Sequence, residues 1–116
     1  MAENDCIFCK IIHGEIPSEL VYEDDWVAAF KDVAPVAPVH ILIVPKKHIP
    51  ALNDASDEDS LALGKIQLAA VKIAEAQGIK DKGYRLISNC GKDAGQVVMH
   101  IHYHLIGGKS MGWSPD

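Results

Sequence analysis

Hydrophobic positions along the chain fall into short runs separated by polar or glycine- and proline-containing segments, and these runs predict the elements of the fold. Five runs indicate strands, at residues 20–23, 26–31, 40–44, 84–88 and 98–106. A tight turn at Asp24 and Asp25 joins the first two, and Pro45 closes the third. Pro35 and Pro38 keep the segment between the second and third strands extended and loop-like.

One long helix is predicted between the third and fourth strands. The sequence Ser-Asp-Glu-Asp at residues 56–59 resembles a capping box, with acidic residues at the helix N-terminus. The helix should run to about Gln77, where Gly78 is a suitable residue to end it. A second, short helix is predicted over residues 6–13, ended by Gly14 and Pro17.

The long helix carries two apolar stripes rather than one. The first contains Leu63, Ile66, Ala70 and Ile73, and the second contains Leu61, Leu68 and Val71. A helix that is apolar on more than one side can be covered twice, by its own sheet and by a partner chain. We therefore expect a homodimer.

These elements predict an α+β fold, with a mainly antiparallel five-stranded sheet, one long helix and a short N-terminal helix. At 116 residues the chain should form a single domain over residues 1–116. The net charge of −5 argues against binding to nucleic acid or to an anionic membrane surface. The acidic N-terminus lacks a signal-peptide pattern and three cysteines do not suggest a disulfide framework, so we expect a cytoplasmic protein.

Candidate chemistry is concentrated in His100, His102 and His104, which alternate with apolar residues. On a strand these three histidines would share one face. Imidazole is the side chain that can act as nucleophile, proton shuttle or metal ligand near neutral pH. A neutral imidazole can attack phosphorus, and a second histidine can protonate the leaving group. The preceding loop, residues 89–96, contains Gly91 and Gly95 and could offer backbone N–H groups to phosphate oxygens.

A second candidate site begins at the Cys-x-x-C pair of Cys6 and Cys9. This spacing supplies two ligands of a structural zinc site, and His48 and His100 are candidates for the other two. A redox-active pair and two reduced core cysteines are alternatives. Cys90, in the loop, is expected to be a bystander.

The run His-Ile-His-Tyr-His-Leu-Ile at residues 100–106 resembles the signature of the histidine triad superfamily. The resemblance extends over nearly the whole chain, and it is strongest to the Hint branch. It includes Cys-Ile-Phe-Cys-Lys-Ile-Ile, His-Ile-Leu-Ile-Val-Pro-Lys-Lys-His-Ile, Gly-Tyr-Arg-Leu-Ile-Ser-Asn and Gly-Gly-Lys-Ser-Met-Gly-Trp.

This resemblance implies a homodimeric nucleotide-binding phosphoramidase that acts on adenosine 5′-monophosphoramidate, aminoacyl-adenylate-like substrates and other AMP or GMP derivatives. It implies no organic cofactor and a possible zinc ion. His102 would be the nucleophile, His104 would assist the leaving group, and His100 and His40 would complete the catalytic cluster. Nucleotide contacts are implied for Phe30, Asp32, Val33, Asn89, Gly95, Gln96, Val97, His102 and His104.

Other interpretations of these residues are open at this point. Phe30 and Val33 could be core residues, and Asp32 could simply start a turn. Val97 stands where Hint proteins often carry serine, so a hydroxyl contact to phosphate would be lost. The tail around Trp113 matches a segment that reaches toward the partner's site in the family dimer. A dinucleoside polyphosphate hydrolase and a nucleotide-binding regulatory protein with little turnover are the alternative functions.

Overall fold

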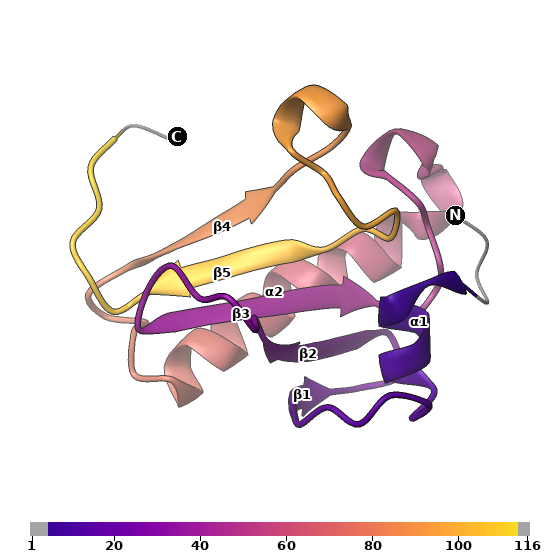
Figure 1. Cartoon of the computed structure of the whole chain (residues 1–116). Coiled ribbons are helices and arrows are strands. Elements are labelled where there is room, and N and C mark those ends of the chain that lie inside the picture. Colours follow the sequence, from indigo (N-terminus) through magenta and orange to yellow (C-terminus); the bar gives the residue numbers. More distant parts are fainter. Residues whose placement is uncertain (1–4, 114–116) are drawn as a thin grey trace.

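A computed structural model describes residues 5–113 and shows a five-stranded sheet with a helix on each face (Figure 1). The helices are α1 (Ile7–Ile12) and α2 (Ser60–Ala76), and the strands are β1 (Leu20–Glu23), β2 (Val27–Lys31), β3 (Val39–Pro45), β4 (Tyr84–Ser88) and β5 (Tyr103–Gly107). Short 3-10 turns occupy Leu52–Asp54, Asp57–Asp59 and Lys92–Ala94. The predicted α+β class and the five antiparallel strands are confirmed.

The strand order is β1-β2-β3-β5-β4, and every neighbouring pair is antiparallel. The β3–β5 pairing places Leu42 opposite His104 and His40 opposite Ile106. His40 therefore lies diagonal to His104 across the pair, close enough for two side chains on one face to meet. This register brings together residues that are 64 positions apart in the sequence.

Two hydrophobic clusters lie on opposite faces of the sheet. On one face Ile43 and Leu105 pack with Ile66 of α2, and these side chains are almost completely buried. On the other face Phe8 of α1 packs with Phe30 and other strand residues. Figure 1 shows α2 behind the sheet and α1 in front of it, near one end. The short helix thus covers only part of its face.

Helix α2 begins and ends as the sequence predicts. Ser56 and Asp59 form a reciprocal capping box in the turn that leads into the helix. At the other end Gln77 is the capping residue, and Gly78 has a φ of +76°. This left-handed backbone conformation favours glycine, because other residues meet a steric penalty there.

The two apolar stripes of α2 have different environments. Ile66, Ala70 and Ile73 are buried against the sheet, whereas Leu61 is 54% exposed and Leu68 is 60% exposed. The first stripe is therefore the core-facing side, and the second is uncovered in the single chain. No helix among residues 5–113 combines the length and apolar character required to cross a membrane.

The predicted strand at residues 98–106 is wrong in its first half. The ladder of β5 starts only at Tyr103, because its partner strand β3 ends at Pro45, which has no N–H to donate. The chain instead bonds to the loop after β3, where the Ile101 N–H donates to the Ile49 carbonyl at 2.8 Å. His100 and His102 consequently lie just before the strand, with more backbone freedom than a ladder would allow.

Candidate functional site

The alternation of the histidine row is retained although only its last histidine lies within β5. Ile101, Tyr103 and Leu105 belong to the cluster on the α2 side of the sheet. The histidine rings lie on the other side, where the His102 and His104 ring centroids are 5.2 Å apart. His100 is fully buried, whereas His102 and His104 are partly exposed. Solvent and a ligand can therefore reach the last two.

A hydrogen bond to the backbone fixes the tautomer of His102. Its Nδ1 lies 2.8 Å from the carbonyl oxygen of His100. A carbonyl can only accept, so Nδ1 must carry the proton. In the neutral ring Nε2 then carries the lone pair, which is the form needed in a nucleophile. The irregular segment before β5 makes this contact possible, because it joins two residues only two positions apart.

A chain of hydrogen bonds determines the tautomer of His104 in the same way. The Val36 backbone N–H donates to His40 Nδ1 at 3.1 Å, so the proton of the neutral His40 ring is on Nε2. That Nε2 lies 2.9 Å from His104 Nδ1 and 3.3 Å from an oxygen of Asp32. His104 Nδ1 is the acceptor of the closer contact, and the proton of its neutral ring is therefore on Nε2. His104 presents a donor beside the lone pair of His102.

The surroundings of His104 favour its neutral form. Burial lowers the pKa of His104 below its ordinary value, and the nearby His102 and His40 rings lower it further, against the opposing charge of Asp32. A neutral ring is also what the hydrogen-bond chain requires, since a proton on His104 Nδ1 would face the N–H of His40. The pKa and the geometry agree.

Asp32, His40 and His104 have ligand atoms within 4.8 Å of one another, a spacing that could also hold a metal ion. The hydrogen bonds argue against that use. A metal at His40 Nε2 would require the ring proton on Nδ1, where the Val36 N–H already donates. The three side chains are better suited to holding tautomers than to holding a cation.

The structure adds Phe8, which the sequence reasoning did not single out. Its ring centroid lies 5.1 Å from that of His102 in an edge-on arrangement and 5.4 Å from that of Phe30. Phe8 thus connects His102 to the apolar wall that contains Phe30. In the sequence it is one apolar residue of a short helix, and nothing in the pattern separates it from an ordinary core residue.

Gln96 braces the glycine-containing loop before the histidines. Its side-chain oxygen accepts from the Gly91 N–H at 2.9 Å, and its amide nitrogen donates to the carbonyls of Pro50 at 2.8 Å and Val98 at 3.1 Å. The loop closes through Gly95, whose φ is +82°. Because the Gln96 amide bonds to these backbone groups of the protein itself, it holds the loop in its shape.

The remaining predicted contact residues differ in exposure. Phe30 is buried, Asp32 and Asn89 are partly exposed, Gly95 is exposed and Val97 is 83% exposed. Val33 is 100% exposed, so its interpretation as a core residue is wrong. The reason is that β2 ends at Lys31 and the chain turns outward, with the Asp32 carboxylate accepting from the Ala34 N–H. The side chain of Val33 is therefore available to a ligand.

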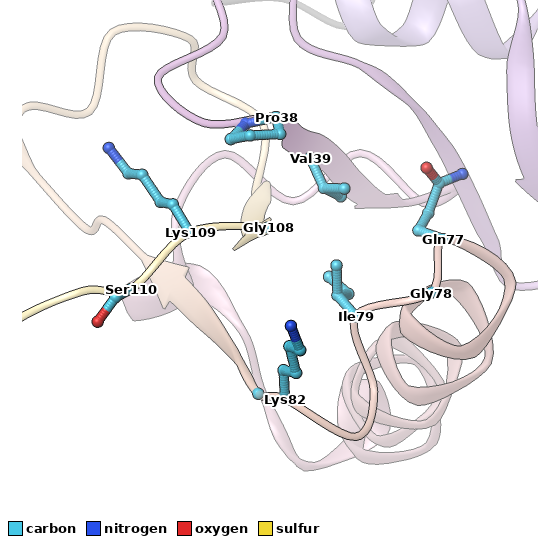
Figure 2. A pocket seen from close by; sticks show the side chains of 10 residues that line it. Pro38, Val39, Gln77, Gly78, Ile79, Lys82, Gly108, Lys109 and Ser110 are labelled. Atoms are coloured by element: carbon cyan, nitrogen blue, oxygen red, sulfur yellow. The ribbon is translucent and has the colours of Figure 1, made fainter.

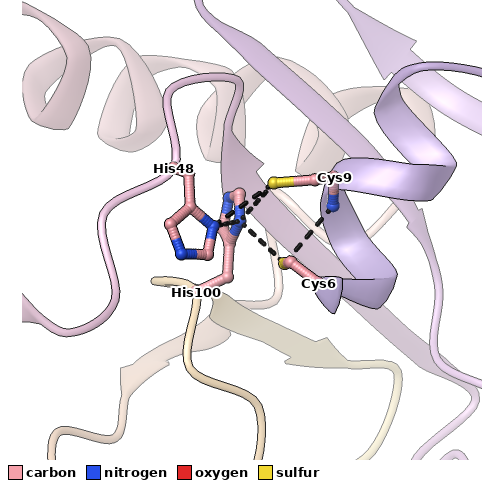
Figure 3. A group of neighbouring side chains, drawn as sticks. All are labelled: Cys6, Cys9, His48 and His100. Atoms are coloured by element: carbon pink, nitrogen blue, oxygen red, sulfur yellow. Dashed lines mark hydrogen bonds between the residues drawn. The ribbon is translucent and has the colours of Figure 1, made fainter. Parts of the chain in front are cut away.

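Cys6, Cys9, His48 and His100 converge from three separate parts of the chain (Figure 3). His100 Nδ1 lies 3.3 Å from Cys6 Sγ and 3.5 Å from Cys9 Sγ. His48 Nδ1 lies 3.3 Å from Cys9 Sγ and 3.2 Å from His100 Nδ1. Tetrahedral zinc with ordinary bond lengths would place two nitrogens about 3.3 Å apart and a nitrogen and a sulfur about 3.6 Å apart.

The donor set also fits a metal chemically. Two thiols and two imidazoles in tetrahedral arrangement are a typical zinc environment. His100 Nε2 lies 2.8 Å from the Pro45 carbonyl, so this nitrogen carries the proton and Nδ1 is left as a lone pair facing the cluster. His48 Nε2 is buried and has no hydrogen-bond partner among the described residues. Simple core cysteines would not require this convergence of four ligand atoms.

A large cavity lies away from the histidines. It has a volume of about 750 Å³ and lies between the C-terminal end of α2 and the end of β5, with Ile79, Lys82 and Lys109 among its lining residues (Figure 2). A smaller cavity of about 150 Å³ is lined by residues that include Asp32 and His40. The chemistry of the side chains, and not the size of a cavity, therefore identifies the histidine cluster as the candidate active site.

Comparison with known proteins identifies the family. The sequence model of the HIT domain matches residues 13–111. The chain belongs to the HIT domain family. It is 54% identical over 112 residues to the "Purine nucleoside phosphoramidase" of Escherichia coli, which covers 97% of this chain and 93% of that protein. The resemblance to the histidine triad superfamily is confirmed.

Solved structures agree with this family assignment. The "HIT family hydrolase from Clostridium thermocellum" superimposes with a TM-score of 0.93 at 52% identity, and the match covers 99% of each chain. The "histidine triad nucleotide-binding protein from Candida albicans" superimposes with a TM-score of 0.79 at 35% identity, and the match covers 96% of this chain and 84% of that chain. The chain is a HIT-family hydrolase.

Proposed function

We propose that this hydrolase cleaves the P–N bond of purine nucleoside 5′-phosphoramidates, with His102 as the nucleophile. The observation that carries the proposal is the hydrogen bond from His102 Nδ1 to the His100 carbonyl, which leaves a lone pair on Nε2. The name of the similar Escherichia coli protein supports the choice of substrate. Adenosine 5′-monophosphoramidate and aminoacyl-adenylate-like compounds are the substrates to test.

In the first step His102 Nε2 attacks the α-phosphorus and forms a covalent nucleotidyl-histidine. The P–N bond breaks, its electron pair goes to the leaving nitrogen, and the amine departs after it takes up a proton from solvent at the partly exposed His104 side of the site. The neutral His104 keeps its Nε2 proton and stabilises the leaving nitrogen by donating a hydrogen bond to it, because His40 already occupies Nδ1. The His100 carbonyl stabilises the positive charge that develops on the His102 ring.

In the second step water attacks the phosphorus and the bond to His102 Nε2 breaks, with its electron pair returning to nitrogen. The proton released by water replaces the one that left with the amine. Asp32 would bind the ribose hydroxyls and Phe30 and Val33 the base, while Asn89, Gly95, Gln96 and Val97 would shape the phosphate cradle. The internal bonds of the Gln96 amide support a positioning role for it in that cradle.

The test is turnover of adenosine phosphoramidate by the wild-type protein and by His102→Ala. We expect turnover to be abolished in the variant while AMP binding largely persists, since the other proposed contacts are unchanged. His13→Ala is the matched control, because His13 is an exposed histidine outside the cluster. Substantial activity in His102→Ala would refute the assignment of the nucleophile. Turnover of a dinucleoside polyphosphate alone would favour the alternative hydrolase, and stable binding without turnover would favour a regulatory role.

We propose zinc as the metal held by Cys6, Cys9, His48 and His100. The thiol and imidazole donors and their separations support this choice. When bound, zinc would link α1 to the segment before β5, and no step of the reaction uses it. Metal content of the purified protein, measured by mass spectrometry in wild type and Cys9→Ser, tests the proposal. Zinc content that is the same in both proteins would contradict it.

We also propose a homodimer that covers the second stripe of α2. Leu61 and Leu68 are largely exposed there, and Gly64 between them has no heavy atom within 4 Å of an added Cβ, which leaves room for a partner side chain.

The proposed compartment is the cytoplasm. The odd number of cysteines supports this compartment, because it does not suggest a disulfide framework.

A further inference from the structure

The Cys6-x-x-Cys9 pair and the catalytic histidine share two points of contact. Phe8 lies between the two cysteines in the chain, and its ring packs edge-on against His102 with centroids 5.1 Å apart. His100 supplies one ring to the cysteine cluster, while its backbone carbonyl accepts a hydrogen bond from His102 Nδ1–H. Any movement of the cluster is therefore transmitted to His102 in two ways. Phe8 transmits it to the position of the His102 ring, and the His100 carbonyl transmits it to the hydrogen bond that fixes the His102 tautomer.

The first contact depends on helix α1, which is too short to be stable alone. It has six residues, whereas isolated helices shorter than about 12–15 residues are marginal in water. Cys6 is its capping residue and accepts from the Cys9 N–H. The position of α1, and with it that of Phe8, is consequently set by what the two cysteines and Phe8 itself contact.

The second contact depends on whether a proton or a metal ion binds the four ligand atoms of the cluster. The Nδ1 atoms of His48 and His100 are 3.2 Å apart, and the lone pair of His100 faces this gap because its Nε2 donates to Pro45. Two imidazole lone pairs at this separation repel unless a proton or a cation lies between them. A metal ion satisfies all four donors at once, whereas removing it favours a relaxed arrangement of His100.

We propose that the Cys6–Cys9–His48–His100 cluster is a positioning site, in which metal occupancy sets the nucleotide affinity of the neighbouring pocket through Phe8 and the His100 carbonyl. This inference rests on the proposed nucleotide-binding function. Coupling between two sites is reciprocal, so bound nucleotide must tighten metal binding by the same factor. Loss of this factor in a Phe8 variant that keeps its metal affinity would distinguish positioning through Phe8 from a purely structural role of the metal.

The experiment measures AMP affinity by calorimetry in the Zn²⁺-loaded and the chelator-treated protein, and Zn²⁺ affinity by chelator competition with and without AMP. We expect AMP to bind at least about five-fold more tightly to the loaded protein, with the same factor for Zn²⁺ when AMP is present. Phe8→Leu should retain Zn²⁺ affinity and reduce this factor. Cys90→Ser, which removes the third thiol, is the matched control and should leave the factor unchanged.

Cys6→Ser separates the metal from the helix cap, because serine is itself a good capping residue. It should lower Zn²⁺ affinity and give the AMP affinity of the metal-free protein. Equal AMP affinities in the loaded and metal-free wild type would overturn the proposal. If the metal-free chain unfolds, Co²⁺-loaded protein provides the readout: AMP should change its visible absorption spectrum in wild type and less in Phe8→Leu. An unchanged wild-type spectrum would also overturn it.

These measurements do not use turnover, so they separate the two proposals. Reciprocal coupling without phosphoramidate cleavage would leave the positioning site standing and reject the proposed reaction. Cleavage that depends on His102, without coupling between AMP and Zn²⁺, would do the reverse.

Discussion

Replacing Gln96 by alanine should destabilise both the fold and the glycine-containing loop at residues 89–96. The Gln96 side chain is 7% exposed, and its amide makes hydrogen bonds of 2.9, 2.8 and 3.1 Å to Gly91, Pro50 and Val98. Each such bond contributes roughly 1 kcal/mol net, so their loss should cost about 2–3 kcal/mol of unfolding free energy. For a domain of this size that corresponds to a fall in melting temperature of roughly 8–15 °C.

The assay combines thermal unfolding with steady-state kinetics on adenosine phosphoramidate. We expect the KM of Gln96→Ala to rise more than its kcat falls, because the loop loosens while the bond between His102 and the His100 carbonyl persists. Gln96→Glu keeps the shape but places carboxylate oxygens against two carbonyls, so it should be at least as unstable as the alanine variant. Gln67→Ala, at an exposed position of α2, is the control. A melting temperature of Gln96→Ala equal to that of this control would refute the reasoning.

Three further predictions concern other parts of the molecule. Because burial lowers the pKa of His104, the stability that its neutral ring contributes is present above the unfolded-state pKa of about 6.5 and is lost as the pH falls toward the folded-state pKa. His104→Gln should therefore flatten the decline of the melting temperature in acid, and His13→Gln should not. Gly107→Ala should destabilise the chain by roughly 1–3 kcal/mol in urea unfolding, since the new Cβ would lie 2.6 Å from Ile79 Cδ1; unchanged stability would contradict this close packing. Leu68→Glu should convert a dimer into a folded monomer by light scattering, and a dimer that persists would exclude this face as the interface.

Local signals in the sequence were sufficient for most of the elements. The capping box at Ser56 and Asp59 predicted the start of α2, and Gly78 predicted its end, because these features depend on residues only a few positions apart. Alternating apolar residues also predicted which side of the histidine row faces the core. The Cys-x-x-Cys spacing indicated two metal ligands, with His48 and His100 as candidates for the other two, and the structure brings all four side chains together.

Only the tertiary structure decided the protonation pattern and the neighbours of His102, the proposed nucleophile. The end of β3 at Pro45 stops the ladder, and the histidine segment therefore becomes irregular and lets His102 bond to its own chain. The β3–β5 register places His40 against His104, and the packing of α1 places Phe8 on His102. These contacts join residues far apart in the sequence, and they depend on strand pairing and helix packing that no local pattern specifies.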